Sequence, residues 1–224
     1  RQEFTANVSH ELKTPLHAIS GYAELLENGM VRPEDVKPFA GKIRAESARM
    51  TSLVEDIINL TKLDNGGAEM TWEDCDLYRI AENAVDSLMT TAEAENVRLD
   101  LSGSHAMVYG VPQQLYSIVY NLCDNAIKYH TAEGKVWVRV NQDASGVTLQ
   151  VQDNGIGIPE DCQDRIFERF YRVDKSRSKA AGGTGLGLSI VKHAVLIHKA
   201  YIQVRSKPGI GSEFTVFFPN RKEK

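Results

Sequence analysis

The chain has 224 residues, of which 42% are hydrophobic, and this composition allows a sizeable core and excludes global disorder. Its formal net charge of −4, from 26 Lys and Arg against 30 Asp and Glu, does not indicate a surface for nucleic acid or for an anionic membrane. No apolar run approaches the length of a membrane span, and no signal peptide is visible. The cysteines Cys75, Cys123 and Cys162 lack metal-ligand spacing and fit reduced thiols of a cytosolic protein.

The chain opens with a predicted helix over residues 4–28, whose apolar residues recur in steps of three and four and so share one face. These residues are Phe4, Val8, Leu12, Leu16, Ile19, Ala23 and Leu26. The stretch "ENGMVRPED" ends this helix, with Gly29 at its close and Pro33 at the next start. The first residues already fit a helix without a cap, so we expect this helix to begin before the given sequence.

A second long helix follows, and its apolar residues repeat every seven positions. The two rows of this seam are Val36, Ile43, Met50, Ile57 and Phe39, Glu46, Leu53, Leu60, with Glu46 as the polar member. Two antiparallel helices with one-sided seams cannot close a core alone. We therefore expect a second copy of the chain to cover both rows and complete a dimeric four-helix bundle. Packing against the rest of the same chain is the alternative, which the length of the seam disfavours.

The segment "KLDNGGAEM" is a break in composition, and we place a domain boundary there, between residues 1–66 and 67–224. Beyond it the apolar patterns predict both strands and helices. Strands are expected at 70–76, at 96–102, in a hairpin over 135–155 and on both sides of "SKPGIGS", and helices at 77–94, 112–129, near 160–170 and at 186–198. Because these elements mix without a strict βαβ rhythm, the expected fold is α+β, a mixed sheet with helices on one face.

The stretch "SHELKTPL" holds the first candidate for chemistry. His10 lies two positions before Leu12, about 200° around the helix, so it points away from the apolar face. Glu11 is adjacent and Thr14 lies one turn on, on the histidine's own face. Pro15 removes the helical bond to the Glu11 carbonyl and should bend the helix there. A carboxylate that holds one ring proton leaves the other nitrogen's lone pair free, so His10 fits a reachable nucleophile.

A lone exposed histidine is usually only solvated. We give that interpretation to His17, His105, His130 and His198.

Two further motifs fit a nucleotide. In "NLCDNAIKYH", Asn121, Asn125 and Lys128 share one helical stripe, which suits a magnesium triphosphate, although an ordinary polar helix face is the alternative. In "VQDNGIGIP", Asp153 ends an apolar strand and could accept a hydrogen bond from an exocyclic amine. The glycines after it, Gly155 and Gly157, allow close backbone approach. The same letters are also ordinary turn chemistry.

The last motif, "RIFERFYRVDKSRSKAAGGTGLGLSIVKH", is a basic stretch that closes in glycines at a helix start. A cationic loop leading to a helix N-terminus suits phosphates. The spacing is neither that of a Walker loop nor that of a dinucleotide fingerprint. A disordered basic loop is the alternative.

Taken in order, these motifs resemble the catalytic core of bacterial two-component sensor histidine kinases. "SHELKTPL" resembles the phosphoacceptor box of their dimerisation and histidine phosphotransfer domain. "NLCDNAIKY", "DNGIGIP", "FERFYRVD" and "GGTGLGLSIVKH" resemble the N, G1, F and G2 boxes of their ATP-binding domain. The resemblance covers residues 1–219 and implies, for the second domain, the Bergerat (GHKL ATPase) fold shared with gyrase, Hsp90 and MutL.

The resemblance implies a protein-histidine kinase that uses ATP and Mg²⁺. His10 would accept the phosphoryl group and pass it to an aspartate of a response regulator. Glu11 would orient or deprotonate His10, and Thr14 would place water for dephosphorylation of that regulator. A homodimer through the hairpin is also implied. The chain would be the cytoplasmic part of a membrane-anchored protein, with membrane contact only in segments before residue 1.

For the nucleotide, the resemblance implies Mg²⁺ coordination by Asn125 with help from Asn121. Lys128 would meet phosphate, Tyr129 would stack near adenine, and Asp153 would read the adenine amino group. Arg172 or Arg177 would approach the γ-phosphate. The other residues expected to contact nucleotide are Gly155, Gly157, Gly183, Thr184, Gly185, Leu186 and Gly187.

The chain departs from the family pattern at two places. Val111 stands where the family often has Asp, and Lys199-Ala200 stand where it often has Gly-Gly. Both departures look structural and outside the site.

Two other functions fit part of the sequence. One is a signalling platform that dimerises without catalysis, which the complete set of motifs disfavours. The other is an ATPase of the gyrase and Hsp90 type, which the histidine hairpin disfavours.

Overall fold

The computed structural model describes residues 2–64, 70–174 and 183–220. So far as it is described, the chain forms two compact units, residues 1–61 and 62–224. The boundary predicted between residues 66 and 67 lies outside the described residues and stays a prediction. Within the described part, no helix is long and apolar enough to cross a membrane.

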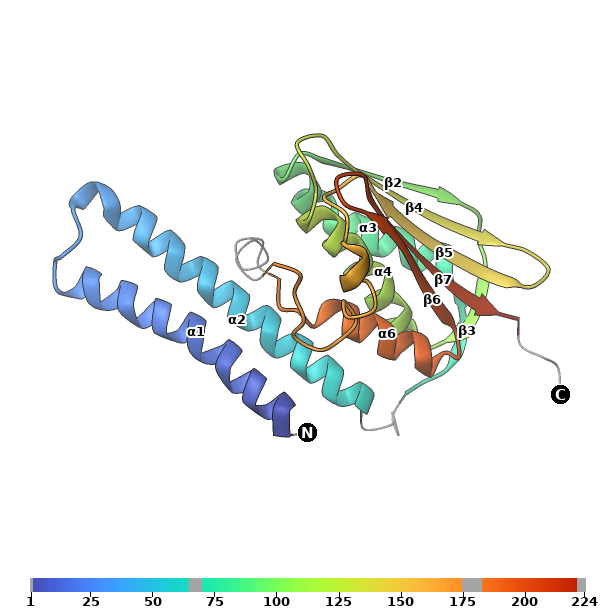
Figure 1. The fold of residues 1–224 in the computed structure, drawn as a ribbon, viewed down its shortest axis with the longest axis horizontal. Helices are drawn as coiled ribbons and strands as arrows, with labels where there is room; N and C mark the ends of the chain where they lie inside the picture. Colours follow the sequence, from blue (N-terminus) through green and yellow to red (C-terminus); the bar gives the residue numbers. More distant parts are fainter. Residues whose placement is uncertain (1, 65–69, 175–182, 221–224) are drawn as a thin grey trace. The chain divides into compact units, whose positions relative to one another are not determined.

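The first unit is a helical hairpin (Figure 1). Helix α1 spans Gln2–Glu27, the 3-10 turn η1 spans Pro33–Asp35, and helix α2 spans Val36–Asp64. Gly29 ends α1 at φ 65°, and the Met30 N–H donates to the Leu25 carbonyl at 3.0 Å, so the last carbonyls of the helix are satisfied. Pro15 lies inside α1, and the helix continues through it. The predicted hairpin and its turn are confirmed.

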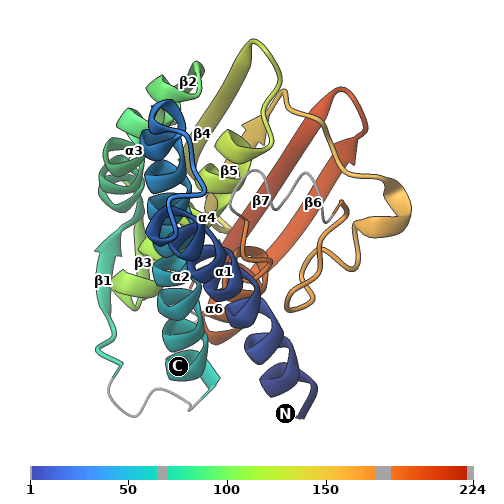
Figure 2. The ribbon, with the colours of Figure 1, turned by 90° about the vertical axis from the view of Figure 1, so that its left-hand side faces the viewer.

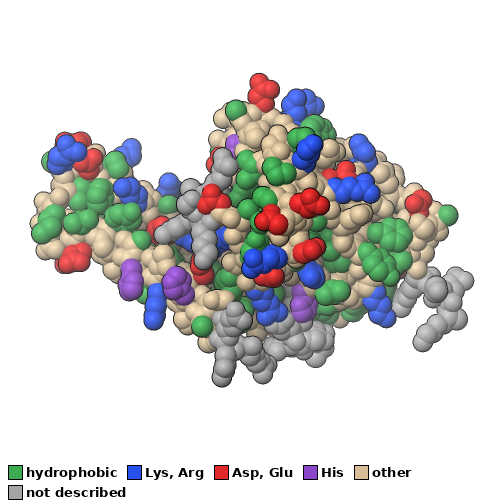
Figure 3. Space-filling model, in the orientation of Figure 1, with side chains coloured by type: hydrophobic (Ala, Val, Ile, Leu, Met, Phe, Trp, Pro, Cys, Tyr) green, Lys and Arg blue, Asp and Glu red, His purple; other side chains and the backbone are tan. Residues whose placement is uncertain are grey.

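The hairpin leaves apolar side chains exposed, and only some of them belong to the predicted heptad rows. Leu53 and Leu60 are already buried in the single chain, so the expectation that they need a second copy was wrong. Ile43 is half-buried, whereas Val36 is 45% exposed. Figure 3 shows a group of hydrophobic side chains near the turn of the hairpin. The large hydrophobic residues exposed on this unit are Leu16, Leu25, Met30, Val36, Val54 and Ile58.

The second unit is built on a mixed sheet, which in the described residues has the strand order β2-β4-β5-β7-β6. Its strands are β2 Val97–Gly103, β4 Gly134–Gln142, β5 Gly146–Asp153, β6 Tyr201–Lys207 and β7 Gly211–Pro219. β2 and β4 pair in parallel, and the other neighbours pair antiparallel. A separate small sheet joins β1, Glu73–Asp76, to β3, Met107–Gly110.

Three helices of the described chain cover one face of this sheet (Figure 2): α3 Leu77–Ala94, α4 Pro112–Lys128 and α6 Gly187–Ile197. Alternate strand residues such as Val138, Leu149 and Val216 are fully buried, because successive side chains of a strand point to opposite faces. The helices bury their apolar stripes against them, including Leu115 and Leu122 of α4. The predicted α+β sandwich with helices on one face is confirmed.

The helix predicted near residues 160–170 is wrong. Only a 3-10 turn, η2 Glu160–Cys162, forms there, and turns follow it. Phe170 has φ 64°, and its N–H donates to the Gly185 carbonyl at 2.8 Å, so its hydrogen bond goes to a distant residue instead of to the preceding turn of a helix. Ile166 is buried, and Phe167 packs edge-to-face on Phe214. Tertiary packing explains the apolar spacing that suggested a helix.

Three of the histidines interpreted as simply solvated, His105, His130 and His198, are engaged in the structure. His198 Nε2 accepts the N–H of Val111 at 3.0 Å, so Nδ1 carries the proton and donates to the Ala194 carbonyl at 2.7 Å. Burial lowers the pKa of His198, since only the neutral ring fits this arrangement. His130 Nδ1 lies 2.6 Å from the Ile127 carbonyl.

Both departures from the family pattern have a structural explanation. Val111 is the N-cap of α4 and makes no side-chain capping bond, which an aspartate could make. Lys199 has φ 53°, the left-handed conformation that favours glycine, and it leads from α6 into β6.

Asp76 ties the start of α3 to the rest of the second unit. Its Oδ1 accepts the N–H groups of Tyr78 and Arg79, and its Oδ2 lies 2.5 Å from His105 Nδ1. Burial opposes ionisation, but the bonds from His105 and the two N–H groups outweigh it and lower the pKa of Asp76. Asp76 is therefore a helix cap that is strongest when ionised.

We expect Asp76→Ala to lower the free energy of unfolding of the second unit by about 1–2 kcal/mol at pH 7, because two helix N–H groups lose their acceptor. The loss should shrink as the pH falls through the lowered pKa of Asp76, where the wild-type carboxylate is protonated too. Urea unfolding followed by tryptophan fluorescence measures this unit, since Trp72 and Trp137 both lie in it. Asp74→Ala, at an exposed position of β1, is the control, and an equal effect of the two variants would contradict the capping role.

Candidate functional site

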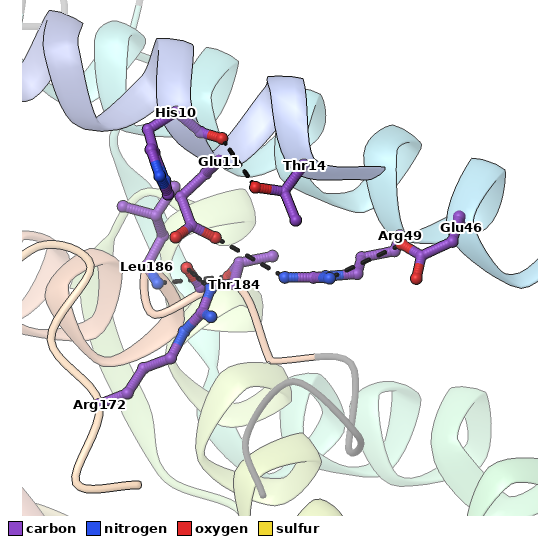
Figure 4. A network of polar contacts seen from close by, with 8 residues as sticks. All are labelled: His10, Glu11, Thr14, Glu46, Arg49, Arg172, Thr184 and Leu186. Atoms are coloured by element: carbon purple, nitrogen blue, oxygen red, sulfur yellow. Dashed lines mark hydrogen bonds and ion pairs between the residues drawn. The ribbon is translucent and has the colours of Figure 1, made fainter. Parts of the chain in front are cut away.

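The hairpin presents His10 to solvent from α1. Thr14 Oγ1, one turn on, donates to the His10 carbonyl at 3.2 Å, which keeps its hydroxyl on the histidine's side of the helix. On α2, the Arg49 guanidinium lies 3.6 Å from a carboxylate oxygen of Glu11 and 3.6 Å from one of Glu46 (Figure 4). The acid beside the exposed histidine is therefore held by a cation from the second helix.

In the second unit, Asp153 stands at the end of β5 and is partly buried. Its Oδ1 accepts the Gly155 N–H at 2.8 Å and the Ser212 N–H at 3.2 Å. Burial raises the pKa of Asp153, and these two hydrogen bonds only partly offset the rise. Among the described residues, Oδ2 has no hydrogen-bond partner. The carboxylate is thus oriented through one oxygen and can offer the other to a donor such as an exocyclic amine.

The glycines after Asp153 are required by the protein's own backbone. A Cβ on Gly155 would lie 2.4 Å from the Tyr129 carbonyl oxygen. Gly157 has φ 69°, and a Cβ there would lie 2.1 Å from the Lys207 carbonyl oxygen. The close backbone approach that the motif predicted is therefore an approach between two segments of this chain.

Helix α4 and the start of α6 bring the carboxamides together. Asn121 Nδ2 donates to the Ser117 carbonyl at 2.8 Å, which leaves Oδ1 facing the start of α6. A Cβ on Gly187, the first residue of α6, would lie 2.7 Å from Asn121 Oδ1 and 3.7 Å from Asn125 Nδ2. Glycine there keeps space open between the two helices. Amide oxygens are suitable Mg²⁺ ligands, so the two asparagines fit a metal-bound triphosphate at this place.

Lys128, on the same stripe, has a partner that the motif did not reveal. Its Nζ lies 2.6 Å from Asp124 Oδ2, an i,i+4 ion pair on α4. A phosphate would have to compete with that carboxylate for the ammonium. The next residue, Tyr129, is the C-cap of α4, and its carbonyl accepts the Ile156 N–H at 3.1 Å.

The residues before α6 are held by contacts with the segment around residue 170. Arg172 Nη2 donates to the Thr184 carbonyl at 2.9 Å, and Thr184 Oγ1 accepts the Leu186 N–H at 3.2 Å (Figure 4). Gly185 has φ 75° and accepts the Phe170 N–H. A guanidinium and a helix N-terminus therefore lie close together, an arrangement that suits an anion such as a phosphate.

The structure gathers most of the predicted nucleotide residues in the second unit, on the end of β5, α4 and the start of α6. Gly183 is also described, next to Thr184. Arg177 lies outside the described residues, and so do Lys175 and Lys179 of the predicted basic loop.

The sequence interpretation missed three residues that the geometry makes prominent: Arg49, Asp124 and Ser212. Glu46, the polar member of an apolar row, was the signal that could have pointed to a cation such as Arg49.

Comparison with known proteins agrees with both units. Residues 1–66 match the His Kinase A (phospho-acceptor) domain, and residues 110–222 match the histidine kinase-, DNA gyrase B- and HSP90-like ATPase family. The sensor-like histidine kinase SenX3 of Mycolicibacterium smegmatis is 39% identical over 220 residues, which cover 98% of this chain and 57% of that protein. The sensor protein kinase WalK of Staphylococcus haemolyticus is 36% identical over 222 residues, 98% of this chain and 36% of that protein. The chain therefore spans only part of the length of these relatives.

Solved structures share the fold. The histidine kinase AdeS of Acinetobacter baumannii superposes with a TM-score of 0.75 at 24% identity, over 94% of this chain and 97% of that one. The histidine kinase ThkA, in complex with the response regulator protein TrrA, gives a TM-score of 0.76 at 21% identity, over 97% of this chain and 61% of that one.

We expect Asp153→Asn to weaken the binding of Mg-ATP by about tenfold or more without destabilising the protein. Asparagine keeps an oxygen for the Gly155 and Ser212 N–H groups but replaces Oδ2 by an NH₂ group, which cannot accept from an amine. Because burial raises the pKa of Asp153, the folded state resists ionisation. The variant should therefore be at least as stable at pH 7, and this advantage should fade as the pH falls through the raised pKa.

The measurements are nucleotide titration and urea unfolding at pH 7 and pH 4. Asp153→Ala, which removes both hydrogen bonds, is the comparison and should lose stability as well as binding. A stable Asp153→Asn protein that bound Mg-ATP like the wild type would contradict the assignment.

Proposed function

Because the chain belongs to the sensor histidine kinases, in which a phosphoacceptor domain precedes an ATPase domain, we propose that it transfers the γ-phosphoryl group of ATP to His10 and then to an aspartate of a response regulator. The observation that carries this proposal is the exposed His10 beside Glu11 in the unit that matches the phosphoacceptor domain. The nucleotide would bind the other unit. We place the boundary of the two domains between residues 66 and 67.

In the proposed reaction, the lone pair of one His10 ring nitrogen forms the N–P bond as the bond from the γ-phosphorus to the β–γ bridging oxygen breaks. Glu11 holds the proton on the other ring nitrogen and takes it as the ring gains charge. Its ion pair with Arg49 holds that carboxylate beside helix α2. Positioning and charge neutralisation supply most of the catalysis of phosphoryl transfer.

The second unit would bind and orient the nucleotide. Asp153 Oδ2 would accept from the adenine amino group, and Tyr129 would lie beside the ring. Bound Mg²⁺ would neutralise phosphate charge, with Asn125 and Asn121 as the residues that hold it. Lys128 and Arg172 would meet phosphate. Residues 183–187 and the N–H groups that open α6 would cradle the phosphates.

The partner would be a cognate response regulator, and the structure of ThkA with the regulator TrrA supports this class of partner. Thr14 would hold a water for hydrolysis of the regulator's aspartyl phosphate. Its hydroxyl donates to the His10 carbonyl and can still accept a hydrogen bond from that water. Since the relatives named as sensor kinases are longer than this chain, we propose that it is the cytoplasmic portion of a membrane-anchored sensor.

A homodimer through the hairpin is part of the proposal. Val54 and Ile58 of α2 are 41% and 47% exposed, and Leu16 of α1 is 49% exposed. Apolar side chains along a long helical pair are expected to find a partner surface, and a second copy completes a four-helix bundle.

The autophosphorylation test uses ATP labelled on the γ-phosphate. The label should enter the wild-type chain, survive alkali and disappear in acid, as expected of a phosphoramidate. His10→Gln should take up none of it, while His17→Gln, on the same helix and also exposed, should behave like the wild type. Label in the His10→Gln protein would rule out His10 as the acceptor. A wild-type chain that binds ATP without incorporating label would favour a docking platform, or, if it released free phosphate, an ATPase.

The dimer test places a charge on the exposed apolar face. Val54→Lys should weaken dimerisation by about a hundredfold or more, since each dimer would bury two unpaired charges. The single chain should stay folded, because Val54 is exposed in it. Sedimentation equilibrium at micromolar concentration measures the change, with Ser52→Lys at an exposed polar position of α2 as the control. A wild-type monomer, or an unchanged Val54→Lys dimer, would refute this interface.

A further inference from the structure

A small polar cluster of Ser206, Ser212 and Gln163 lies near the end of β5 that carries Asp153, with Ser206 at its centre. Ser206 Oγ accepts the Ile158 N–H at 2.7 Å, donates to the Gly211 carbonyl at 3.0 Å and lies 2.9 Å from Ser212 Oγ. A hydroxyl has one donor and two acceptor sites, so all three are used when Ser212 is the donor of the third bond. This one side chain therefore joins loop 154–159 to both strands of the β6–β7 hairpin.

Gln163 closes the cluster from the segment after η2. Its Nε2 donates to the carbonyls of Ile158 and Ser206, both at 3.0 Å. Two carbonyl acceptors fix which end of the amide faces them, because the oxygen of a flipped amide would be repelled. The backbone N–H and C=O of Ile158 are thus both bound by side chains, one from β6 and one from Gln163. Ser206 and Gln163 together thus fix loop 154–159 at the end that is distant from Asp153, and we call this pair of residues the clamp.

The clamp acts on the two donors that orient Asp153. The Gly155 N–H belongs to the clamped loop, and the Ser212 N–H belongs to the hairpin that Ser206 holds. Backbone packing transmits any shift between them: a Cβ on Gly211 would lie 2.0 Å from the Asp153 carbonyl oxygen, and the Gly209 N–H donates to the Ile156 carbonyl at 2.8 Å. A displacement of the loop or the hairpin would therefore turn the Asp153 carboxylate.

We propose that Gln163 and Ser206 are positioning residues for recognition of the base: they hold loop 154–159 on the β6–β7 hairpin so that Asp153 Oδ2 meets the 6-amino group of adenine. The inference rests on the proposed function. It has a consequence that a purely structural role lacks. Loss of the clamp should reduce the affinity gained from the 6-amino group and leave the affinity gained from the phosphates largely intact.

The test compares Mg-ATP with the Mg complex of purine riboside triphosphate, which lacks the 6-amino group, by competition with a fluorescent ribose-labelled ATP. The wild type should prefer ATP by about tenfold or more, as expected for a hydrogen bond to a charged acceptor. Gln163→Met and Ser206→Ala should weaken ATP binding by about tenfold and change binding of the analogue by less than about threefold. Ser206→Thr, which keeps the hydroxyl, should retain most of the preference.

Gln203→Met, at an exposed position of β6, is the matched control and should bind both nucleotides like the wild type. If Gln163→Met does not fold, Ser206→Ala and Ser206→Thr still decide the question, and thermal unfolding identifies that case. Folded variants that keep the wild-type ratio of affinities, or that lose both nucleotides equally, overturn this inference. A wild type that binds neither nucleotide overturns the proposed function instead.

Discussion

The proposed base-recognition site depends on one partly buried carboxylate, that of Asp153. Asp153 is kept at the end of β5 by two backbone N–H groups from different segments, one from the loop after it and one from the opposite hairpin. Burial raises the pKa of Asp153, and carboxylates perturbed in this way are common at binding sites. The glycines on both sides serve this arrangement, because Gly155, Gly157 and Gly211 allow backbone contacts that no side chain would permit.

The proposed phosphate end of the site depends on two helices whose apolar faces pack on the same sheet. The packing of α4 and α6 on the core brings their polar edges together, so that Asn121 meets the glycine that opens α6. The N–H groups at the start of a helix need partners, and those of α6 lie beside a guanidinium that is already held by Thr184. The proposed polyanion site thus lies where hydrophobic packing brings the surfaces of two helices close to each other.

In the hairpin the corresponding constraint is the charge triad of Glu11, Arg49 and Glu46. Two carboxylates share one guanidinium, so neither acid is isolated beside the apolar face. This arrangement ties Glu11, the acid next to His10 on α1, to Arg49 on α2. His10 itself stays exposed, as the proposed transfer from a nucleotide to a regulator requires.

The sequence by itself determined the elements whose hydrogen bonds and apolar periods are local. The hairpin, the helix over residues 77–94 and the β4–β5 hairpin were all predicted, and so were the residues of the motifs, because a motif's letters are adjacent in the chain. Only the tertiary structure decided the hydrogen bonds, ion pairs and strand pairing between segments that lie far apart in the sequence. The expected helix near residue 165 gave way to the bond from Phe170 to Gly185, and strand β3 was missed because its partner β1 lies some thirty residues away. Ser206 and Gln163 carried no local signal, since they bond to segments outside their own elements. Glu46 was the one local sign of Arg49, whose other partner, Glu11, comes from α1. Polar contacts over long sequence separations depend on how the core packs, and no pattern of neighbouring residues records that.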